Sequence, residues 1–167
     1  MARSISRMQF LRGDFQGVEK PLRPPWAVDE NQFVELCNRC EDCIPSCPTA
    51  ILVKGRASYP VVDFSRGECE FCGNCVAACK TGALLRTSDP EEVPWKLKAV
   101  IADNCITYQS VVCRSCAEQC ESRAIAFQLS AGRVPQPLLA NEKCNGCGAC
   151  VAICPVDAIS VEKPACV

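Results

Sequence analysis

Apolar residues occur along the chain in short runs that alternate with polar, cysteine-rich segments. Short runs rich in Val, Ile, Leu and Ala predict β-strands, because an amphipathic helix needs a longer periodic stripe to bury one face. Gly and Pro between the runs mark turns, so neighbouring strands are expected to pair. The predicted strands are residues 50–53, 61–64, 95–101, 124–127 and 158–161, with turns at Gly55 to Pro60 and at Gly132 to Pro135, before Leu138 and Leu139.

One short helix is predicted ahead of the first cysteine. Asp29 followed by Gln32 is typical of a helix start, and Phe33 and Leu36 lie one turn apart on one face. A cysteine loop, a short helix, a strand, a turn and a second strand then recur four times along the chain. This order predicts an α+β protein built from repeated small units.

Cysteine supplies 17 of the 167 residues, a share that dominates every other feature of the composition. Most of these cysteines follow the spacing Cys-x2-Cys-x2-Cys-x3-Cys, by which bacterial ferredoxins hold pairs of [4Fe–4S] clusters. Gly146 and Gly148 favour the left-handed backbone of such a loop. The expected ligands are Cys37, Cys40, Cys43, Cys47, Cys69, Cys72, Cys75, Cys79, Cys105, Cys113, Cys116, Cys120, Cys144, Cys147, Cys150 and Cys154.

The fourth cysteine of each motif is expected to serve a neighbouring cluster. It follows the third by about one helical turn and therefore points away from its own loop. Pairing adjacent motifs predicts four sets, and Cys166 is left over as a spare thiol. The sets are Cys37, Cys40, Cys43 with Cys79; Cys69, Cys72, Cys75 with Cys47; Cys105, Cys113, Cys116 with Cys154; and Cys144, Cys147, Cys150 with Cys120.

The third motif departs from the regular spacing. Seven residues separate Cys105 from Cys113, and Glu121 stands where proline closes the first and fourth motifs. A longer loop can still close on a cluster, but it fixes fewer backbone groups in advance. Four [4Fe–4S] clusters are expected, or three if the third motif is empty.

Two other cysteine chemistries compete with iron–sulfur clusters. Disulfide-rich scaffolds are typically secreted, and no apolar stretch of signal-peptide length follows the basic N-terminus. Residues 6–12 are similar to a twin-arginine export signal, but Met8 replaces the second arginine, so export is not expected. Structural zinc usually uses two separated Cys-x2-Cys knuckles, which a three-cysteine run does not suit.

Charge and composition exclude several further classes. The chain contains no histidine, which excludes His-ligated haem, Rieske ligation and histidine acid–base chemistry. Its formal charge of −1 would fall to roughly −9 with four clusters, so nucleic acid is not an expected partner. No apolar run is long enough to span a membrane.

The chain divides by composition into four parts. Residues 1–28 form a basic N-terminal arm that is either a solvated tail or a docking element. Two tandem ferredoxin-like modules follow at residues 29–88, with motifs 1 and 2, and at residues 95–167, with motifs 3 and 4. Residues 89–94 are rich in proline and acid, which is typical of a linker. Each module is too small for a large apolar core, so its clusters are expected to staple the fold.

Three segments carry a resemblance to a known family. The sequence resembles the NapF family, the ferredoxin-type accessory proteins of the periplasmic nitrate reductase system, at Arg23 to Trp26, at Tyr108 to Val111 and at Cys144 to Cys150. The resemblance covers nearly the whole chain, although Lys80 stands where proline is expected. It implies a cytoplasmic iron–sulfur protein that interacts with the catalytic subunit of the nitrate reductase and assists its maturation before export.

Three functions remain open at this stage. The leading hypothesis is a maturation factor that supplies a cluster, or electrons for assembly, to the catalytic subunit. The alternatives are a soluble polyferredoxin electron carrier or electron-transfer subunit, and a chaperone whose clusters serve only its fold. An enzyme with its own substrate is not expected, because the sequence offers no nucleophile–base pair and no nucleotide-binding loop.

Overall fold

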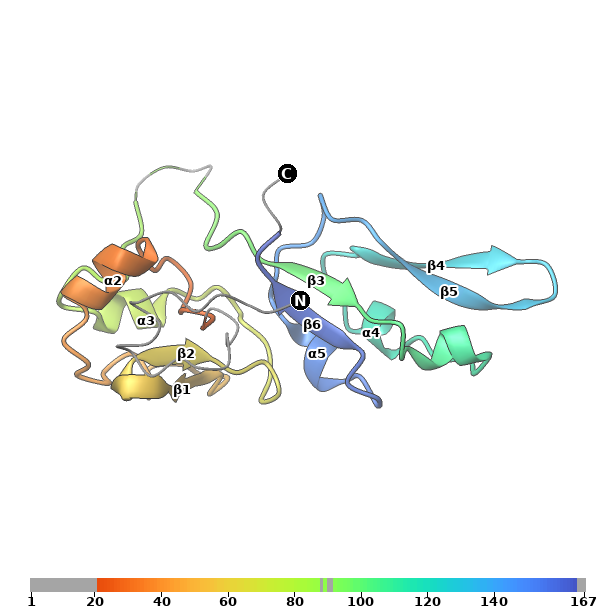
Figure 1. Ribbon diagram of the computed structural model, residues 1–167. Helices are drawn as coiled ribbons and strands as arrows, with labels where there is room; N and C mark the ends of the chain where they lie inside the picture. Colours follow the sequence, from red (N-terminus) through yellow and green to blue (C-terminus); the bar gives the residue numbers. More distant parts are fainter. Residues whose placement is uncertain (1–20, 88, 90–91, 165–167) are drawn as a thin grey trace, which may run out of the picture.

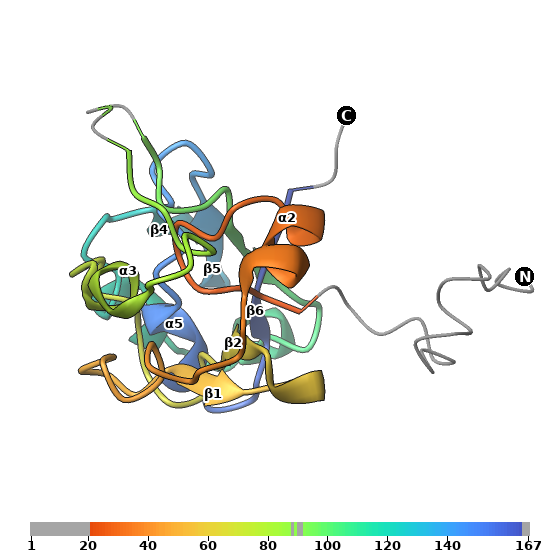
Figure 2. The same cartoon turned by 90° about the vertical axis from the view of Figure 1, so that its left-hand side faces the viewer.

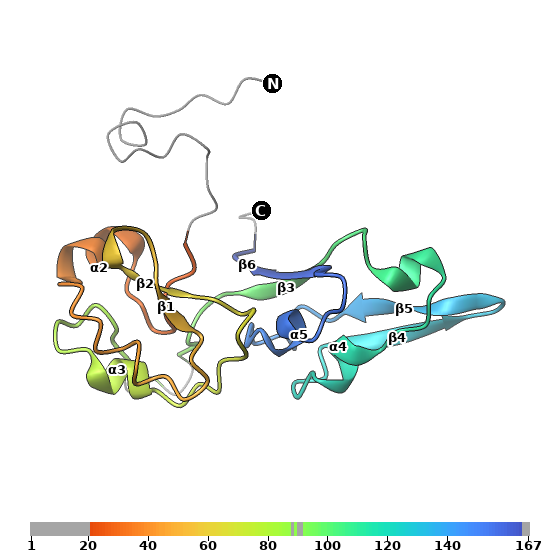
Figure 3. The ribbon, with the colours of Figure 1, turned by 90° about the horizontal axis from the view of Figure 1, so that it is seen from below.

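A computed structural model describes residues 21–87, 89 and 92–164 (Figure 1). The chain forms two small α+β lobes that lie side by side, with a long hairpin projecting from the second (Figures 1 and 3). Most of the basic arm, part of the predicted linker, and Cys166 lie outside the described residues. No helix in the described ranges is long and apolar enough to cross a membrane.

The first lobe is built around one antiparallel hairpin and two helices. Its hairpin pairs β1 with β2 in a register that places Leu52 opposite Val62. A separate bridge joins Ala27 to Leu84 and closes the lobe from the other side. Figure 2 shows α2 above the hairpin, and the Tyr59 hydroxyl just before β2 donates to Val34 O of α2. Its elements are α2 (Glu30–Leu36), β1 (Leu52–Lys54), η1 (Arg56–Ser58), β2 (Pro60–Val62) and α3 (Asn74–Ala78).

The second lobe repeats this plan with longer strands. Its hairpin pairs β4 with β5, and a second ladder, on the side of the first lobe, pairs β3 with β6 and places Ile101 opposite Ile159. The β3–β6 ladder corresponds to the single bridge of the first lobe. The elements are β3 (Lys98–Ile101), η2 (Ile106–Gln109), α4 (Ser115–Glu118), β4 (Ile125–Ser130), β5 (Arg133–Leu139), α5 (Ala149–Ala152) and β6 (Ile159–Glu162).

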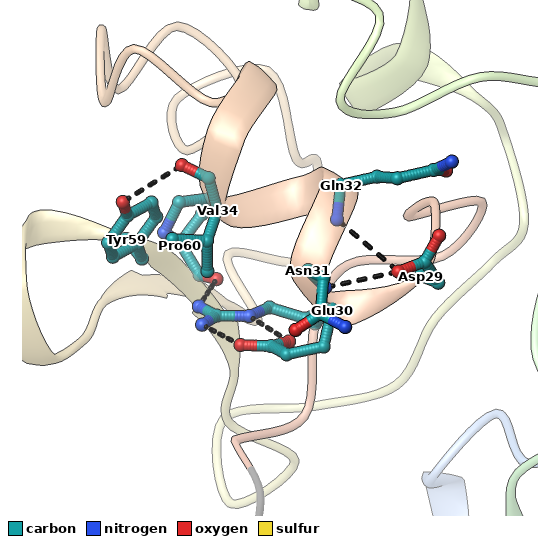
Figure 4. A network of polar contacts seen from close by, with 8 residues as sticks. Asp29, Glu30, Asn31, Gln32, Val34, Tyr59 and Pro60 are labelled. Carbon is teal, nitrogen blue, oxygen red and sulfur yellow. Dashed lines mark hydrogen bonds and ion pairs between the residues drawn. The ribbon is translucent and has the colours of Figure 1, made fainter. Parts of the chain in front are cut away.

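The predicted helix start at Asp29 is confirmed. The Asp29 carboxylate accepts the backbone N–H groups of Asn31 and Gln32, which satisfies two donors that the first turn leaves free (Figure 4). Phe33 is fully buried, whereas Leu36 is exposed at the last turn of the helix. The apolar face is therefore shorter than the sequence suggested.

Several predicted strand limits were wrong by a few residues. Ala50 has a left-handed φ of 54°, so the first strand begins only at Leu52. Strand β3 begins at Lys98 and not at residue 95. Pro135 was expected in a turn but lies within β5, where the hairpin turn is at Ala131 and Gly132. An edge strand tolerates proline because the missing N–H faces away from its neighbour.

One apolar core cluster spans both lobes, and the second lobe has a further cluster of its own around Ala99, Ile125 and Ile159. The cluster around Phe33, Ile51 and Leu84 in the first lobe also contains Leu97 and Val161 of the second. Trp95 stands at the junction, with its ring edge-on to Phe64 at 5.8 Å between centroids. This packing fixes the second and fourth cysteine motifs relative to each other.

Candidate iron–sulfur sites

In the second, third and fourth motifs, the cysteines come from a loop and from the first turn of a short helix. Cys75 lies in α3, Cys116 in α4 and Cys150 in α5. Gly73 and Gly148 precede α3 and α5 with φ angles of 79° and 83°, a left-handed conformation that glycine adopts without steric cost. In the first motif, residues 42–46 form turns in place of a helix.

The second motif lines a cavity together with one cysteine of the first. Cys69, Cys72, Cys75 and Cys47 line this cavity. The structure thus brings together the expected set of three cysteines from one loop and one from the neighbouring motif. We refer to this cavity as site 2, after the motif that supplies three of its cysteines.

The second lobe contains two cavities of the same kind. We call them site 3 and site 4, after the motifs that supply three of their cysteines. The long insertion of the third motif does not pull its cysteines apart, because η2 folds back beside Cys105. The cysteines that line the cavities are Cys105, Cys113, Cys116 and Cys154 at site 3, and Cys144, Cys147, Cys150 and Cys120 at site 4.

The first motif forms site 1. Cys37, Cys40 and Cys43 lie close enough to interact electrostatically, and Cys37 and Cys79 pack against the core that contains Cys43. Cys40 is exposed here, as Cys72 is at site 2. The sixteen cysteines of the described residues all carry free thiols.

The residues at these sites fit [4Fe–4S] clusters. At sites 2, 3 and 4, four thiols surround a cavity, and thiolate sulfur is the ligand type that iron–sulfur clusters take. Within the described ranges, no three Cys, Asp or Glu side chains converge closely enough to hold a single metal ion. The role of the sixteen cysteines as ligands stays a prediction.

Burial raises the pKa of the cysteines at the inner side of each site. Desolvation, helped by neighbouring thiolates, raises the pKa of Cys43, Cys69 and Cys150 to about 12. The same causes raise the pKa of Cys75 and Cys116 to about 11. Without metal these thiols hold their protons at neutral pH, so cluster binding must displace them.

Hydrogen bonds have the opposite effect on the fourth cysteine of three motifs. Burial alone would raise the pKa of Cys47, but the Thr49 hydroxyl and nearby backbone N–H groups lower it overall. The pKa values of Cys79 and Cys120 are lowered in the same way, by backbone N–H groups and by the hydroxyls of Thr81 and Ser122, against the effect of burial. Donors to sulfur favour the thiolate, which is the form that binds iron.

Backbone N–H groups also reach the sulfurs. Leu84 N donates to Cys79 Sγ at 3.4 Å, Ala124 N to Cys120 Sγ at 3.3 Å, and Ala158 N to Cys154 Sγ at 3.2 Å. In the second lobe, Ala99 N of β3 donates to Cys144 Sγ at 3.4 Å. Such donors are among the factors that set the reduction potential of a bound cluster.

The four sites follow one another in a row. Cys43 of site 1 interacts electrostatically with Cys75 of site 2, and Cys150 of site 4 interacts with Cys116 of site 3. Between the lobes, the backbone N–H of Cys69 bonds the carbonyl of Cys147, which joins sites 2 and 4. The order along the molecule is therefore 1, 2, 4, 3.

Sequence reasoning missed several residues that shape the sites. Pro25 and Trp26 line site 2, although they were assigned to the N-terminal arm. The hydroxyls two positions after Cys47, Cys79 and Cys120 were also missed. The pattern Cys-x-Ser/Thr, which recurs at the fourth cysteine of three motifs, was the signal that could have identified the hydroxyls.

Comparison with known protein families agrees with this geometry. The family described as "4Fe-4S dicluster domain" matches residues 28–84, and a second family of the same description matches residues 109–158. The fold is therefore α+β with two tandem ferredoxin-like modules, as predicted. Iron–sulfur chemistry of the [4Fe–4S] type follows from the same matches.

Curated relatives resemble the chain over nearly its whole length. The ferredoxin-type protein NapF of Escherichia coli (strain K12) is 42% identical over 157 residues, covering 94% of each chain. NapF of Haemophilus influenzae (strain ATCC 51907 / DSM 11121 / KW20 / Rd) is 44% identical over 169 residues, covering 95% of this chain and 94% of the relative. The ferredoxin-type protein NapG of Escherichia coli (strain K12) is 30% identical over 162 residues, covering 86% of this chain and 68% of NapG.

Proposed function

The chain belongs to the NapF family of ferredoxin-type proteins, and we propose that it assists maturation of the catalytic subunit of the periplasmic nitrate reductase in the cytoplasm before export. In this proposal it holds four [4Fe–4S] clusters and supplies a cluster, or electrons for cluster assembly, to that subunit. It acts as a binding and transfer protein and not as an enzyme. The observation that carries the proposal is the similarity to NapF over 94% of the chain.

The exposure of two cysteines supports transfer of a cluster. Cys40 at site 1 and Cys72 at site 2 are exposed, whereas Cys43 and Cys75 are buried on the inner side of the same sites. A thiol of an acceptor protein can reach an exposed ligand and replace it without unfolding the site. The first lobe therefore offers two places from which a cluster can be passed on.

An exposed apolar surface in the second lobe supports binding of a partner protein. The insertion of the third motif and the β4–β5 hairpin present apolar side chains to solvent, and η2 packs against β5. Exposed apolar side chains are candidate contacts for a partner protein. In these two segments they are Tyr108, Val111, Val112, Leu129 and Leu138, which together we call the hairpin surface.

The row of four sites favours a second candidate, electron transfer. Sites 1, 2, 4 and 3 follow one another without a break, and the lobes are joined where sites 2 and 4 meet. A protein that only delivers clusters has no need for this continuous order. A soluble polyferredoxin that reduces a partner would use it as a path for electrons.

Labelled iron distinguishes the two candidates. The purified protein is loaded anaerobically with ⁵⁷Fe, incubated with cluster-free catalytic subunit, and separated from it. A cluster donor transfers label to the subunit, and nitrate-reducing activity appears with it. In a parallel incubation with catalytic subunit that already contains its own cluster, an electron carrier reduces the subunit and keeps its label. Retention of label without reduction or activation would contradict both candidates.

The hairpin surface is tested with matched variants. Val112→Gln and Leu129→Gln remove exposed apolar groups, and Leu36→Gln does the same in the first lobe, away from the hairpin. We expect the first two to weaken binding of the catalytic subunit and Leu36→Gln to leave it unchanged. Equal binding by all three variants would exclude the hairpin surface as the docking site.

A further inference from the structure

Trp26 contains a buried hydrogen-bond donor that no protein group accepts. Its side chain is 6% exposed, and its Nε1 is the one buried side-chain nitrogen or oxygen without a partner in the part of the chain that the structure describes. Buried polar groups are nearly always satisfied, so an orphan of this kind points to an acceptor that is not part of the polypeptide.

Trp26 is one of the residues that line site 2. Trp26 and Pro25 line the cavity that Cys47, Cys69, Cys72 and Cys75 surround. The backbone there is firmly held, because Trp26 N donates to Pro94 O at 2.7 Å and Trp26 O accepts Leu85 N at 2.9 Å. Trp26 also has a φ of 59°, which a bulky residue adopts only where its surroundings impose it.

The second lobe shows what occupies the corresponding place at site 4. Leu84 and Ile159 are each the fifth residue after the fourth cysteine of a motif, and they pair with Ala27 and Ile101 respectively. Ala27 of the first lobe therefore corresponds to Ile101 of the second. Two residues earlier in each segment, Pro25 corresponds to Ala99.

Ala99 and Pro25 differ in whether they have a backbone N–H that can donate a hydrogen bond to a cysteine sulfur. Ala99 lines site 4 and donates its backbone N–H to Cys144 Sγ at 3.4 Å. Pro25 lines site 2 but has no backbone N–H. The next two residues cannot supply one either, because Trp26 N bonds Pro94 O and Ala27 N bonds Pro24 O.

We propose that the indole N–H of Trp26 donates a hydrogen bond to a sulfur of the cluster at site 2, in place of the backbone N–H that Pro25 lacks. Trp26 is thus a positioning and tuning residue for this cluster, and the Arg23 to Trp26 segment belongs to site 2. The inference rests on a cluster being held at site 2. It does not depend on which partner the protein serves.

The direction of the effect follows from charge. A [4Fe–4S] cluster with four thiolates becomes more negative when it gains an electron, and a donor to its sulfur stabilises the more negative state. Loss of the Trp26 N–H therefore lowers the reduction potential of one cluster. The three clusters that Trp26 does not line keep their potentials.

The chain offers a matched control, since it has two tryptophans. Trp95 Nε1 already donates to Asn145 O at 3.1 Å, so its N–H has an acceptor within the protein. The experiment uses full-length protein with ¹⁵N-labelled tryptophan in three forms: wild type, Trp26→Phe and Trp95→Phe. Pulsed EPR of the reduced protein measures ¹⁵N hyperfine coupling to a cluster, and a redox titration measures the potentials.

We expect ¹⁵N coupling in the wild type and in Trp95→Phe, and its loss in Trp26→Phe. Trp26→Phe should make one potential more negative, and Trp95→Phe serves as the control for the ¹⁵N coupling. Absence of coupling in Trp95→Phe would overturn the inference, as would unchanged potentials in a Trp26→Phe protein with a full complement of clusters. Trp95→Phe retains Trp26, so it tests the inference even if Trp26→Phe loses its clusters.

Iron and sulfide counts separate this inference from the assignment on which it rests. If Cys72→Ser leaves both counts and the EPR spectrum unchanged, no cluster is held at site 2, and the site assignment and this inference fall together. If Cys72→Ser removes or alters one cluster, and the wild-type protein shows no ¹⁵N coupling, only the role of Trp26 is wrong.

Discussion

The backbone N–H of Cys69 donates a hydrogen bond to the carbonyl oxygen of Cys147 over 2.8 Å, across the boundary between the two lobes. These residues are the first cysteine of the second motif and the second cysteine of the fourth. The contact places sites 2 and 4 next to each other at the centre of the molecule. Anything that disturbs this boundary is expected to affect both sites.

Gly148→Ala tests that boundary. Gly148 has a φ of 83°, and a Cβ at this position would lie 2.0 Å from Cδ1 of Phe64 in the other lobe. The strained backbone costs about 1–3 kcal/mol and the overlap with a packed ring about 1–3 kcal/mol more. We expect faster loss of visible cluster absorption on heating and lower iron content.

Gly132→Ala is the control for Gly148→Ala. Gly132 has a φ of 71°, but no atom lies within 4 Å of the position that a Cβ would take, so only the backbone cost of about 1–3 kcal/mol applies. Its iron content should equal that of the wild type. Equal cluster loss in the two variants would show that contact with Phe64 does not hold the lobes together.

Thr49→Val tests the hydroxyl donor at site 2. The Thr49 hydroxyl lies 3.4 Å from Cys47 Sγ, and valine keeps the shape of threonine without the donor. A hydrogen bond worth about 1 kcal/mol more in the reduced state corresponds to about 40 mV for one electron. We expect one potential to fall by at most about this amount in an EPR-monitored titration. Thr87→Val, whose hydroxyl accepts Asp89 N instead, should leave all potentials unchanged.

Arg23→Lys tests how the N-terminal segment is anchored. Arg23 donates from Nε and Nη2 to the two carboxylate oxygens of Glu30 at 3.0 and 2.7 Å, and its guanidinium lies 4.8 Å from the ring centroid of Phe33. Figure 4 shows Glu30 in this network beside Tyr59 and Pro60. Lysine keeps the charge but loses the planar fork, at a cost of about 1–2 kcal/mol in the stability of the first lobe.

The control for Arg23→Lys is Arg66→Lys. Arg66 pairs with Asp63 at 3.5 Å on an exposed surface, where such pairs contribute about 0–1 kcal/mol. Denaturant-induced loss of the first-lobe clusters should occur earlier in Arg23→Lys and at the wild-type position in Arg66→Lys. The same midpoint for both variants would mean that Arg23 does not anchor the segment.

The sequence predicted which cysteines meet because their spacing determines the geometry locally. Three cysteines within seven residues must share a loop, and a helical turn after Cys75 or Cys150 must direct the fourth cysteine elsewhere. These relationships need no knowledge of distant contacts. Their role as ligands is a chemical prediction that the cavities agree with but do not test.

Contacts between distant segments could not be predicted in the same way. Trp26 packs at site 2 because the Ala27 to Leu84 bridge brings the start of the first lobe to its end, and no local pattern encodes that pairing. Phe64 contacts Gly148 only after the lobes have docked. Pro135 was assigned to a turn by composition, but the edge of a hairpin accepts it.

Removal of iron tests whether the clusters carry the fold. The strands of the first lobe are three residues long and α3 has five residues, so the apolar core alone offers little stability to this lobe. Anaerobic chelation of iron should abolish cooperative unfolding, followed by circular dichroism, and expose the buried Trp26, followed by the fluorescence of the Trp95→Phe variant, in which Trp26 is the one tryptophan. A mock-treated sample is the control. A chelated protein that still unfolds cooperatively with buried tryptophan would show that the polypeptide folds without its clusters, and that Cys47, Cys69, Cys72 and Cys75 can form site 2 before any metal binds.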